Sequence, residues 1–109
     1  MQLLTKTIRL QLEANFKNPD DDHKPVVKLF NPVGAATWLL TEIEPDGDLA
    51  FGLCDLGLGS PELGSVSISE LEGITLPLGL GIERDLHFTA DKTISQYAEA
   101  ARANGYLEA

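Results

Sequence analysis

Residues 69–88 read SELEGITLPLGLGIERDLHF, and this stretch places a helix start, an apolar segment and a charged strand in succession. Ser69 and Glu72 have the spacing of a capping box, in which each side chain binds the other residue's backbone N–H. A helix of about one turn is therefore predicted there, ending at Gly73. Residues 74–81 are almost wholly apolar, but one proline and two glycines exclude a regular helix. We predict that they form an ordered loop crossing the core.

Residues 82–88 alternate in character and predict a strand with two different faces. Ile82, Arg84, Leu86 and Phe88 share one face, and the other carries Glu83, Asp85 and His87. Two carboxylates and an imidazole are a candidate set for a divalent metal or for acid–base chemistry. The alternative is an exposed strand face with ordinary charges, which the absence of a second group of ligand types favours.

Upstream of this stretch the sequence predicts four strands joined by short connections. They cover residues 26–31, 37–44, 49–56 and 63–69, and each contains apolar or alternating residues bounded by turn signals. The EPDG sequence of residues 44–47 predicts a type I turn, so the second and third strands should form a hairpin. The four segments predict an antiparallel meander of four to five strands.

A helix is predicted at each end of the chain. Near the amino end, Thr5 is the expected N-cap, and a stripe of Leu4, Ile8, Leu12 and Phe16 should face the core. Near the carboxyl end, Thr93 and Gln96 form a capping box, and Gly105 is the expected stop. The prediction is therefore an α+β fold of one domain, residues 1–109, with both helices packed on the sheet.

The charge of the chain is unevenly distributed. Eight basic and seventeen acidic side chains give a formal charge of −9. Nine of the acids lie between Lys28 and Arg84, where no basic residue occurs. Such a chain should not bind a phosphate backbone directly, and it should attract a basic protein partner. The candidate partner-binding residues are Glu42, Glu44, Asp46, Asp48, Asp55 and Glu62.

These acids have two interpretations. They can form a solvated surface that keeps a small protein soluble. Alternatively, they can form a row of carboxylates that imitates DNA phosphates and occupies a basic groove on another protein. The sequence leaves both open.

Common catalytic and cofactor motifs are absent from the sequence. No GxxxxGK[ST] or GxSxG pattern occurs, and neither glycine-rich run completes GxGxxG. The single cysteine, Cys54, lies in a predicted strand and is expected to be a small core residue. Trp38 is also expected in the core. A lone cysteine is also typical of a reducing cytoplasm. Lys6 and Arg9 interrupt the first apolar residues, so no signal peptide is expected, nor any membrane span. We expect no enzyme activity and no cofactor.

Four segments carry a family resemblance: FNPVGAATWLLTE, DLAFGLCDLG, ELGSVSISELEGI and LPLGLGIERDLHF. Their order resembles a bacterial family of domains of unknown function, number twenty-nine fifty-eight. Members are found on plasmids, integrative elements and phage-like islands, often near antirestriction and transfer genes. The resemblance implies an accessory protein of a mobile genetic element, and it assigns no activity to any residue.

Composition and resemblance together lead to three hypotheses of function. The first is a cytoplasmic, non-enzymatic DNA mimic with an anti-defence role, which binds a host nuclease or a restriction or CRISPR component. The second is a small metal-dependent enzyme or metal-binding protein that uses Glu83, Asp85 and His87. The third is an accessory subunit of a plasmid transfer or maintenance complex, held by an apolar surface.

Overall fold

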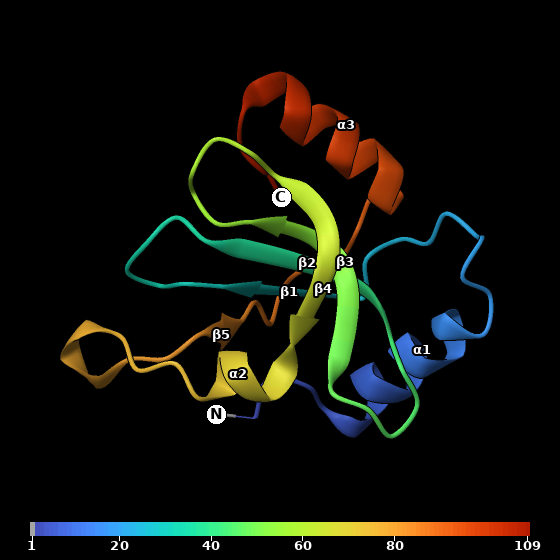
Figure 1. Cartoon of the computed structure of the whole chain (residues 1–109), viewed down its shortest axis with the longest axis horizontal. Helices are drawn as coiled ribbons and strands as arrows, with labels where there is room; N and C mark the ends of the chain where they lie inside the picture. Colours follow the sequence, from blue (N-terminus) through green and yellow to red (C-terminus); the bar gives the residue numbers. More distant parts are fainter. Residues whose placement is uncertain (1) are drawn as a thin grey trace.

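The computed structural model describes residues 2–109 as a single sheet covered by helices on both faces (Figure 1). The sheet has five strands in the order β4-β3-β2-β1-β5, and every neighbouring pair is antiparallel. The strands are β1 (Val27–Phe30), β2 (Thr37–Ile43), β3 (Leu49–Asp55), β4 (Glu62–Ser67) and β5 (Glu83–Arg84). The helices are α1 (Lys6–Phe16), α2 (Ile68–Glu72) and α3 (Ile94–Asn104), with a 3-10 turn η1 (Pro77–Gly79). The predicted α+β meander is confirmed.

Each face of the sheet has its own core. On the first face, side chains of β1, β2 and β3 pack against the chain start, α1 and α2, with Leu12, Leu29 and Leu40 fully buried. On the second face, Leu39 and Leu53 pack against Tyr97 and the small alanines of α3. Figure 1 shows α3 on one side of the strands and α1 and α2 on the other. We call the second face the α3 face.

A β-bulge in β2 decides which side chains reach each face. Leu40 pairs with Gly52 and Glu42 pairs with Phe51, so Thr41 is an extra residue with no partner of its own. Strict alternation from Leu40 would turn Glu42 into the first core. The bulge instead places Glu42 on the α3 face beside Phe51, and it places Ile43 in the first core.

The backbone of the bulge is held by hydrogen bonds. Thr41 is buried, and its Oγ1 donates to the carbonyl of Phe51 (3.2 Å). The Thr41 carbonyl accepts from Asn15 Nδ2 of α1 (2.9 Å). Because an unpaired buried carbonyl is costly, Asn15 both satisfies the bulge and fixes α1 against the sheet.

Both long helices begin where the sequence predicts. Thr5 is the N-cap of α1, and its Oγ1 accepts from the N–H of Ile8 (3.1 Å). In α3, Gln96 Oε1 accepts from the N–H of Thr93 (2.9 Å), and Gly105 ends the helix at a φ of 81°. Leu12 of the predicted α1 stripe is buried, as expected. Phe16, the last residue of the stripe, is 42% exposed and lies at the rim of the core.

The predicted capping box of α2 is wrong. The helix begins two residues earlier, with Ser67 as N-cap accepting from the N–H of Glu70 (3.1 Å). Ser69 instead binds Asp48 from the neighbouring loop. The carboxylate of Glu72 accepts from the N–H of Leu3 (2.9 Å). Long-range partners have therefore displaced the local pairing, although the helix ends at Gly73 as expected.

The predicted burial of residues 74–81 is also wrong. We call this segment the apolar loop; it leaves α2 and extends from the body of the molecule, with its tip at η1 (Figure 1). Ile74 is 38% exposed and Leu78 is 92% exposed. Its backbone hydrogen bonds are made largely within the loop, including Leu76 N to Leu80 O (2.7 Å), so the loop turns back on itself instead of crossing the core, and Leu76 packs partly against the edge of the first core.

Two local predictions near the strands need correction. The strand predicted for residues 82–88 is limited to Glu83–Arg84, because the N–H of His87 donates to Asp85 Oδ1 (2.9 Å) in an Asx turn. The turn of residues 44–47 is closed by Gly47 N to Glu44 O (3.0 Å), but Asp46 has a φ of 53°. A type I turn has negative φ at that position, so the predicted turn type is wrong and the hairpin itself is confirmed.

The bulge gives the first testable prediction. Asn15→Ala removes the donor to the Thr41 carbonyl and should lower the free energy of unfolding by about 1–2 kcal/mol. Chemical denaturation followed by circular dichroism measures this change. Asn18→Ala is the matched control, because Asn18 is exposed and its side chain makes no hydrogen bond within residues 2–109. Equal stability of the two variants would contradict the role assigned to Asn15.

Candidate functional site

The acidic residues of the central segment lie at two opposite ends of the sheet. Glu44, Asp46 and Asp48 occupy the β2–β3 turn. Asp55 ends β3, and Glu62 is paired with Cys54 beside it. Six residue steps of β3 separate the two groups, which is roughly 20 Å of extended chain. The fold therefore does not gather the six candidate residues into a single row.

Asp48 has a structural role at the start of α2. Its carboxylate accepts from the Ser69 N–H (2.8 Å) and Ser69 Oγ (2.8 Å), and it is also bonded to the Ser67 hydroxyl. Hydrogen bonds from Ser67 and Ser69 lower the pKa of Asp48 below its usual 3.8. Both oxygens are already used within the fold.

Asp55 is buried, being only 3% exposed. Its Oδ1 accepts from the N–H of Gly57 (2.8 Å), and its Oδ2 accepts from the N–H of Leu107 (2.8 Å). The carboxylate thus fastens the segment after α3 to the end of β3. Asp55 does not belong to any exposed acidic surface.

Glu42 and Glu44 are two positions apart in extended chain and share one face. Both line a cavity of about 240 Å³ beside Phe16, Phe51 and Ser65. Glu44 Oε1 lies 3.4 Å from the N–H of Leu49 and accepts from it. Glu42 Oε2 is buried and has no hydrogen-bond partner among the described residues. Two members of the predicted set, Glu42 and Glu44, thus line one cavity.

The remaining exposed acids form a small group at the hairpin end. Asp46 and Glu70 are exposed and Glu44 is half-buried. Glu70 follows Ser69, which Asp48 binds, so α2 and the hairpin turn are adjacent. We call Glu44, Asp46 and Glu70 the acidic end. One cation reaches it, since Arg9 Nη1 donates to the Gly47 carbonyl (3.0 Å) while also pairing with Glu13 (3.7 Å). Glu62 is exposed at the opposite end.

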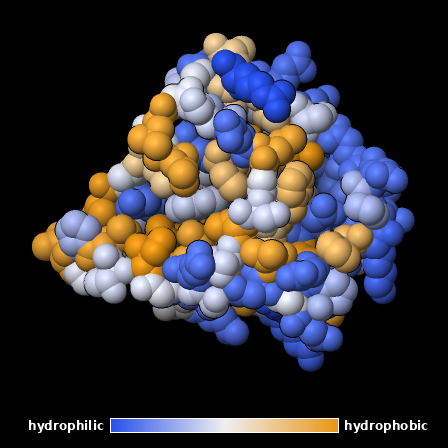
Figure 2. All heavy atoms as spheres, viewed as in Figure 1, coloured by the Kyte–Doolittle hydropathy of each residue, from blue (hydrophilic) through white to orange (hydrophobic). Residues whose placement is uncertain are grey.

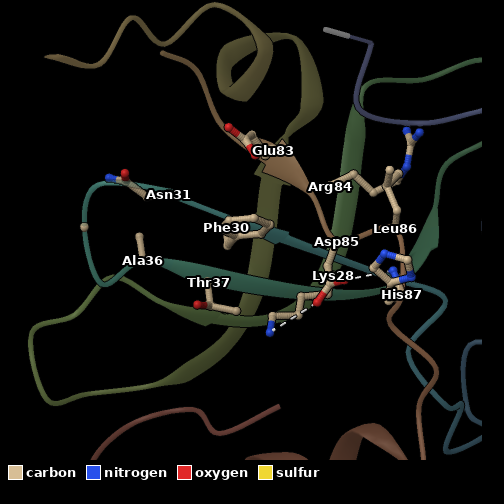
Figure 3. Close-up of a pocket in the computed structure, with 11 residues that line it drawn as sticks. Lys28, Phe30, Asn31, Ala36, Thr37, Glu83, Arg84, Asp85, Leu86 and His87 are labelled. Atoms are coloured by element: carbon tan, nitrogen blue, oxygen red, sulfur yellow. Dashed lines mark hydrogen bonds and ion pairs between the residues drawn. The ribbon is translucent and has the colours of Figure 1, made fainter. Parts of the chain in front are cut away.

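Glu83, Asp85 and His87 line a groove beside the paired strands β1 and β5, but they do not converge on one point (Figure 3). Asp85 pairs with Lys28 (3.6 Å), and Glu83 lies apart from both on the other side of Phe30. Arg84 is directed elsewhere and donates to the Leu3 carbonyl (2.7 Å). Across residues 2–109, no three His, Cys, Asp or Glu side chains are grouped to hold a metal ion.

Cys54 and Trp38 lie in the sheet as the sequence predicts. Trp38 is buried in the first core, and Cys54 packs against its edge. Burial raises the pKa of the Cys54 thiol, which keeps it protonated and weakly nucleophilic. Neither residue is presented for nucleic-acid stacking or covalent chemistry.

The apolar loop is an exposed apolar segment that the sequence predicts to be buried. Figure 2 shows hydrophobic residues along the projecting arm of the molecule that the loop forms. Leu78, at its tip, has a φ of 66°, in the left-handed region that leucine rarely adopts. Burial cannot be read from apolar composition alone, and no local signal in the sequence distinguishes this loop from a core segment.

Comparisons with known proteins add a family but no activity. A family described as "Protein of unknown function (DUF2958)" matches residues 3–108, which is nearly the whole chain. No curated protein and no solved structure matches. In the described part of the chain, no helix has the length and apolar character needed to cross a membrane.

The role of Asp48 predicts a pH-dependent contribution to stability. Its folded pKa lies below 3.8, so its stabilisation is present above that pH and is lost as the pH falls through the folded pKa. Asp48→Asn should therefore melt at a lower temperature than the wild type at pH 7, and the difference should shrink below pH 4. Differential scanning calorimetry across this range measures it, with Asp46→Asn as the exposed control. A difference that stays constant with pH would contradict this role.

Proposed function

We propose that this chain, which belongs to the DUF2958 family, is a non-enzymatic protein-binding module that inserts its apolar loop into a partner protein. The observation that carries the proposal is Leu78, 92% exposed at the loop tip in a left-handed backbone conformation. This proposal corresponds to the third hypothesis from the sequence, an accessory subunit of a plasmid transfer or maintenance complex that is held by an apolar surface.

The conformation of Leu78 is unfavourable for folding alone. A left-handed backbone costs a leucine on the order of 1 kcal/mol relative to glycine, which has no Cβ. The exposed side chain returns almost nothing to the stability of the isolated chain, since it is hardly removed from water. Strained residues of this kind are concentrated at binding sites.

The loop is arranged to bind without much reordering. Leu76 N donates to Leu80 O (2.7 Å) and Gly79 N donates to Leu76 O (3.2 Å), so the tip is closed by its own backbone. A preorganised loop pays little conformational entropy on association. Burying one leucine side chain in a partner's pocket contributes roughly 1.5–3 kcal/mol, which suits Leu78 as the anchor of a larger contact.

The test separates binding from folding. Leu78→Gly removes the side chain and relieves the backbone, so the variant should melt no lower than the wild type while losing captured partner protein. Tagged wild-type and variant chains are compared by quantitative capture from host lysate, with melting temperatures measured in parallel. Capture by the wild type should change little between low and high salt, because the contact is apolar.

The matched control is Leu58→Ala. Leu58 is 82% exposed in another loop and is not in the left-handed region, so its removal should leave capture unchanged. Equal capture by the wild type and Leu78→Gly would rule out the apolar loop as the contact.

A second candidate function is an anti-defence inhibitor that occupies a basic nucleic-acid groove. It is supported by the formal charge of −9 and by the acidic end, where Asp46 and Glu70 are exposed on the hairpin turn and on α2, which Asp48 joins. The spread of the other acids over two ends of the sheet limits any imitation of DNA phosphates to this short group. Such binding should be fast and sensitive to salt.

Charge reversal distinguishes this candidate from the first. The triple variant Glu44→Lys, Asp46→Lys and Glu70→Lys should lose salt-sensitive capture of a basic partner and keep its fold. Asp48 is left unchanged because it caps α2. The control reverses the exposed Glu62, Glu99 and Glu108, which gives the same net charge away from the acidic end. Equal losses in both triples would show that only total charge matters.

A further inference from the structure

The cavity that contains Glu42 lies on the part of the α3 face that α3 leaves open. The helix covers Leu39 and Leu53, toward the end of β3. Phe51 and Leu49 precede Leu53 by two and four residues in β3, so they lie on the same face. Leu49 is 50% exposed. Phe16, at the last turn of α1, closes one side of the cavity. Its volume of about 240 Å³ is below the roughly 300–1,000 Å³ of pockets for drug-sized ligands, so it suits one side chain.

Glu42 reaches this cavity only because of the bulge at Thr41. The bulge reverses the direction of Glu42, which would otherwise enter the first core. The consequence is a carboxylate oxygen, Oε2, that is out of water and has no donor within the described residues. A buried acceptor without a donor is uncommon in native proteins and requires an explanation. A donor supplied by another molecule is one.

The other lining groups define the chemistry of that donor. Glu44 adds a second carboxylate, Ser65 adds a hydroxyl, and no lysine or arginine lines the cavity. Neither glutamate takes part in an ion pair within residues 2–109. Phe16 and Phe51 contribute two aromatic rings. Carboxylates with aromatic rings are the surroundings that guanidinium groups prefer, through paired hydrogen bonds and stacking on the ring faces.

We propose that this cavity receives an arginine side chain of the partner protein. The guanidinium enters between the two carboxylates, with its flat faces toward the phenylalanine rings, and the Glu42 carboxylate turns so that Oε2, which is out of water in the free chain, accepts from it. Arginine fits better than lysine, because a planar group with five donors can serve two carboxylates and stack at the same time. The inference rests on the proposed protein-binding function and adds a second contact, on a surface separate from the apolar loop.

The test uses a short peptide and needs no identified partner. The ¹⁵N-labelled chain is titrated with acetyl-Gly-Arg-Gly-amide, and backbone amide shifts are followed by NMR. Shifts should concentrate at Glu42, Phe51 and Ser65, with half-saturation at about millimolar peptide, as is usual for a single side chain. The lysine peptide should bind several-fold more weakly. The citrulline peptide, which keeps the shape but has no charge, should bind at least about tenfold more weakly.

Two variants and one control make the assignment specific. Glu42→Gln keeps the size of the side chain and should weaken the arginine peptide at least about tenfold. Phe16→Leu keeps the charge, removes a ring, and should weaken it several-fold. Glu62→Gln, at the opposite end of the sheet, should bind as the wild type does. Unchanged spectra elsewhere in each variant confirm that it is folded.

Several results would overturn the inference. These are shifts spread over all acidic residues, citrulline binding equal to arginine binding, lysine binding as tight as arginine, or a Glu42→Gln variant that binds like the wild type. Each leaves the apolar loop untouched, because Leu78→Gly is tested by capture of whole protein. Conversely, a Leu78→Gly variant with full capture removes the proposed loop contact and does not alter the peptide result.

Discussion

The structure depends on one extra residue in β2. Thr41 has no partner in β3, and its insertion reverses the alternation of every residue after it. Ile43 therefore completes the first core and Glu42 leaves it. Asn15 and the Phe51 carbonyl hold the bulge by hydrogen bonds. The same contact fixes α1 against the sheet, so the position of the Glu42 carboxylate and the packing of α1 have a common cause.

The acidic residues show that net charge and a binding surface are different properties. Asp48 and Asp55 belong to the same acidic segment, yet one binds the first turn of α2 and the other anchors the segment after α3. Each satisfies backbone N–H groups that would otherwise lack a partner, and that need is local and strong. Glu42 and Glu44 line the cavity, Asp46 and Glu70 are exposed, and none of these four carboxylates takes part in an ion pair within residues 2–109.

The two proposed contacts differ in their physical basis. The apolar loop presents a preorganised hydrophobic anchor, whose energy comes from removing Leu78 from water and is nearly independent of salt. The cavity at Glu42 offers buried charge and aromatic rings, which give orientation and selectivity for a cationic side chain. A partner that engages both would carry an apolar pocket and an exposed arginine. Neither contact requires a catalytic group, and within residues 2–109 the candidate metal ligands Glu83, Asp85 and His87 do not converge.

Much of the fold follows from the sequence, because its signals are local. The four upstream strands, the hairpin at residues 44–47, and the caps at Thr5 and Thr93 each depend on residues a few positions apart, and the sequence predicts them. Only the tertiary structure decided the rest: the bulge at Thr41, the burial of Asp55 under Leu107, the loss of the Ser69–Glu72 cap to Asp48 and Leu3, and the exposure of Leu78. Each of these features depends on a partner far away in the chain, or on the lack of one. Alternation and spacing do not indicate which distant groups will compete for a hydrogen bond or cover an apolar side chain.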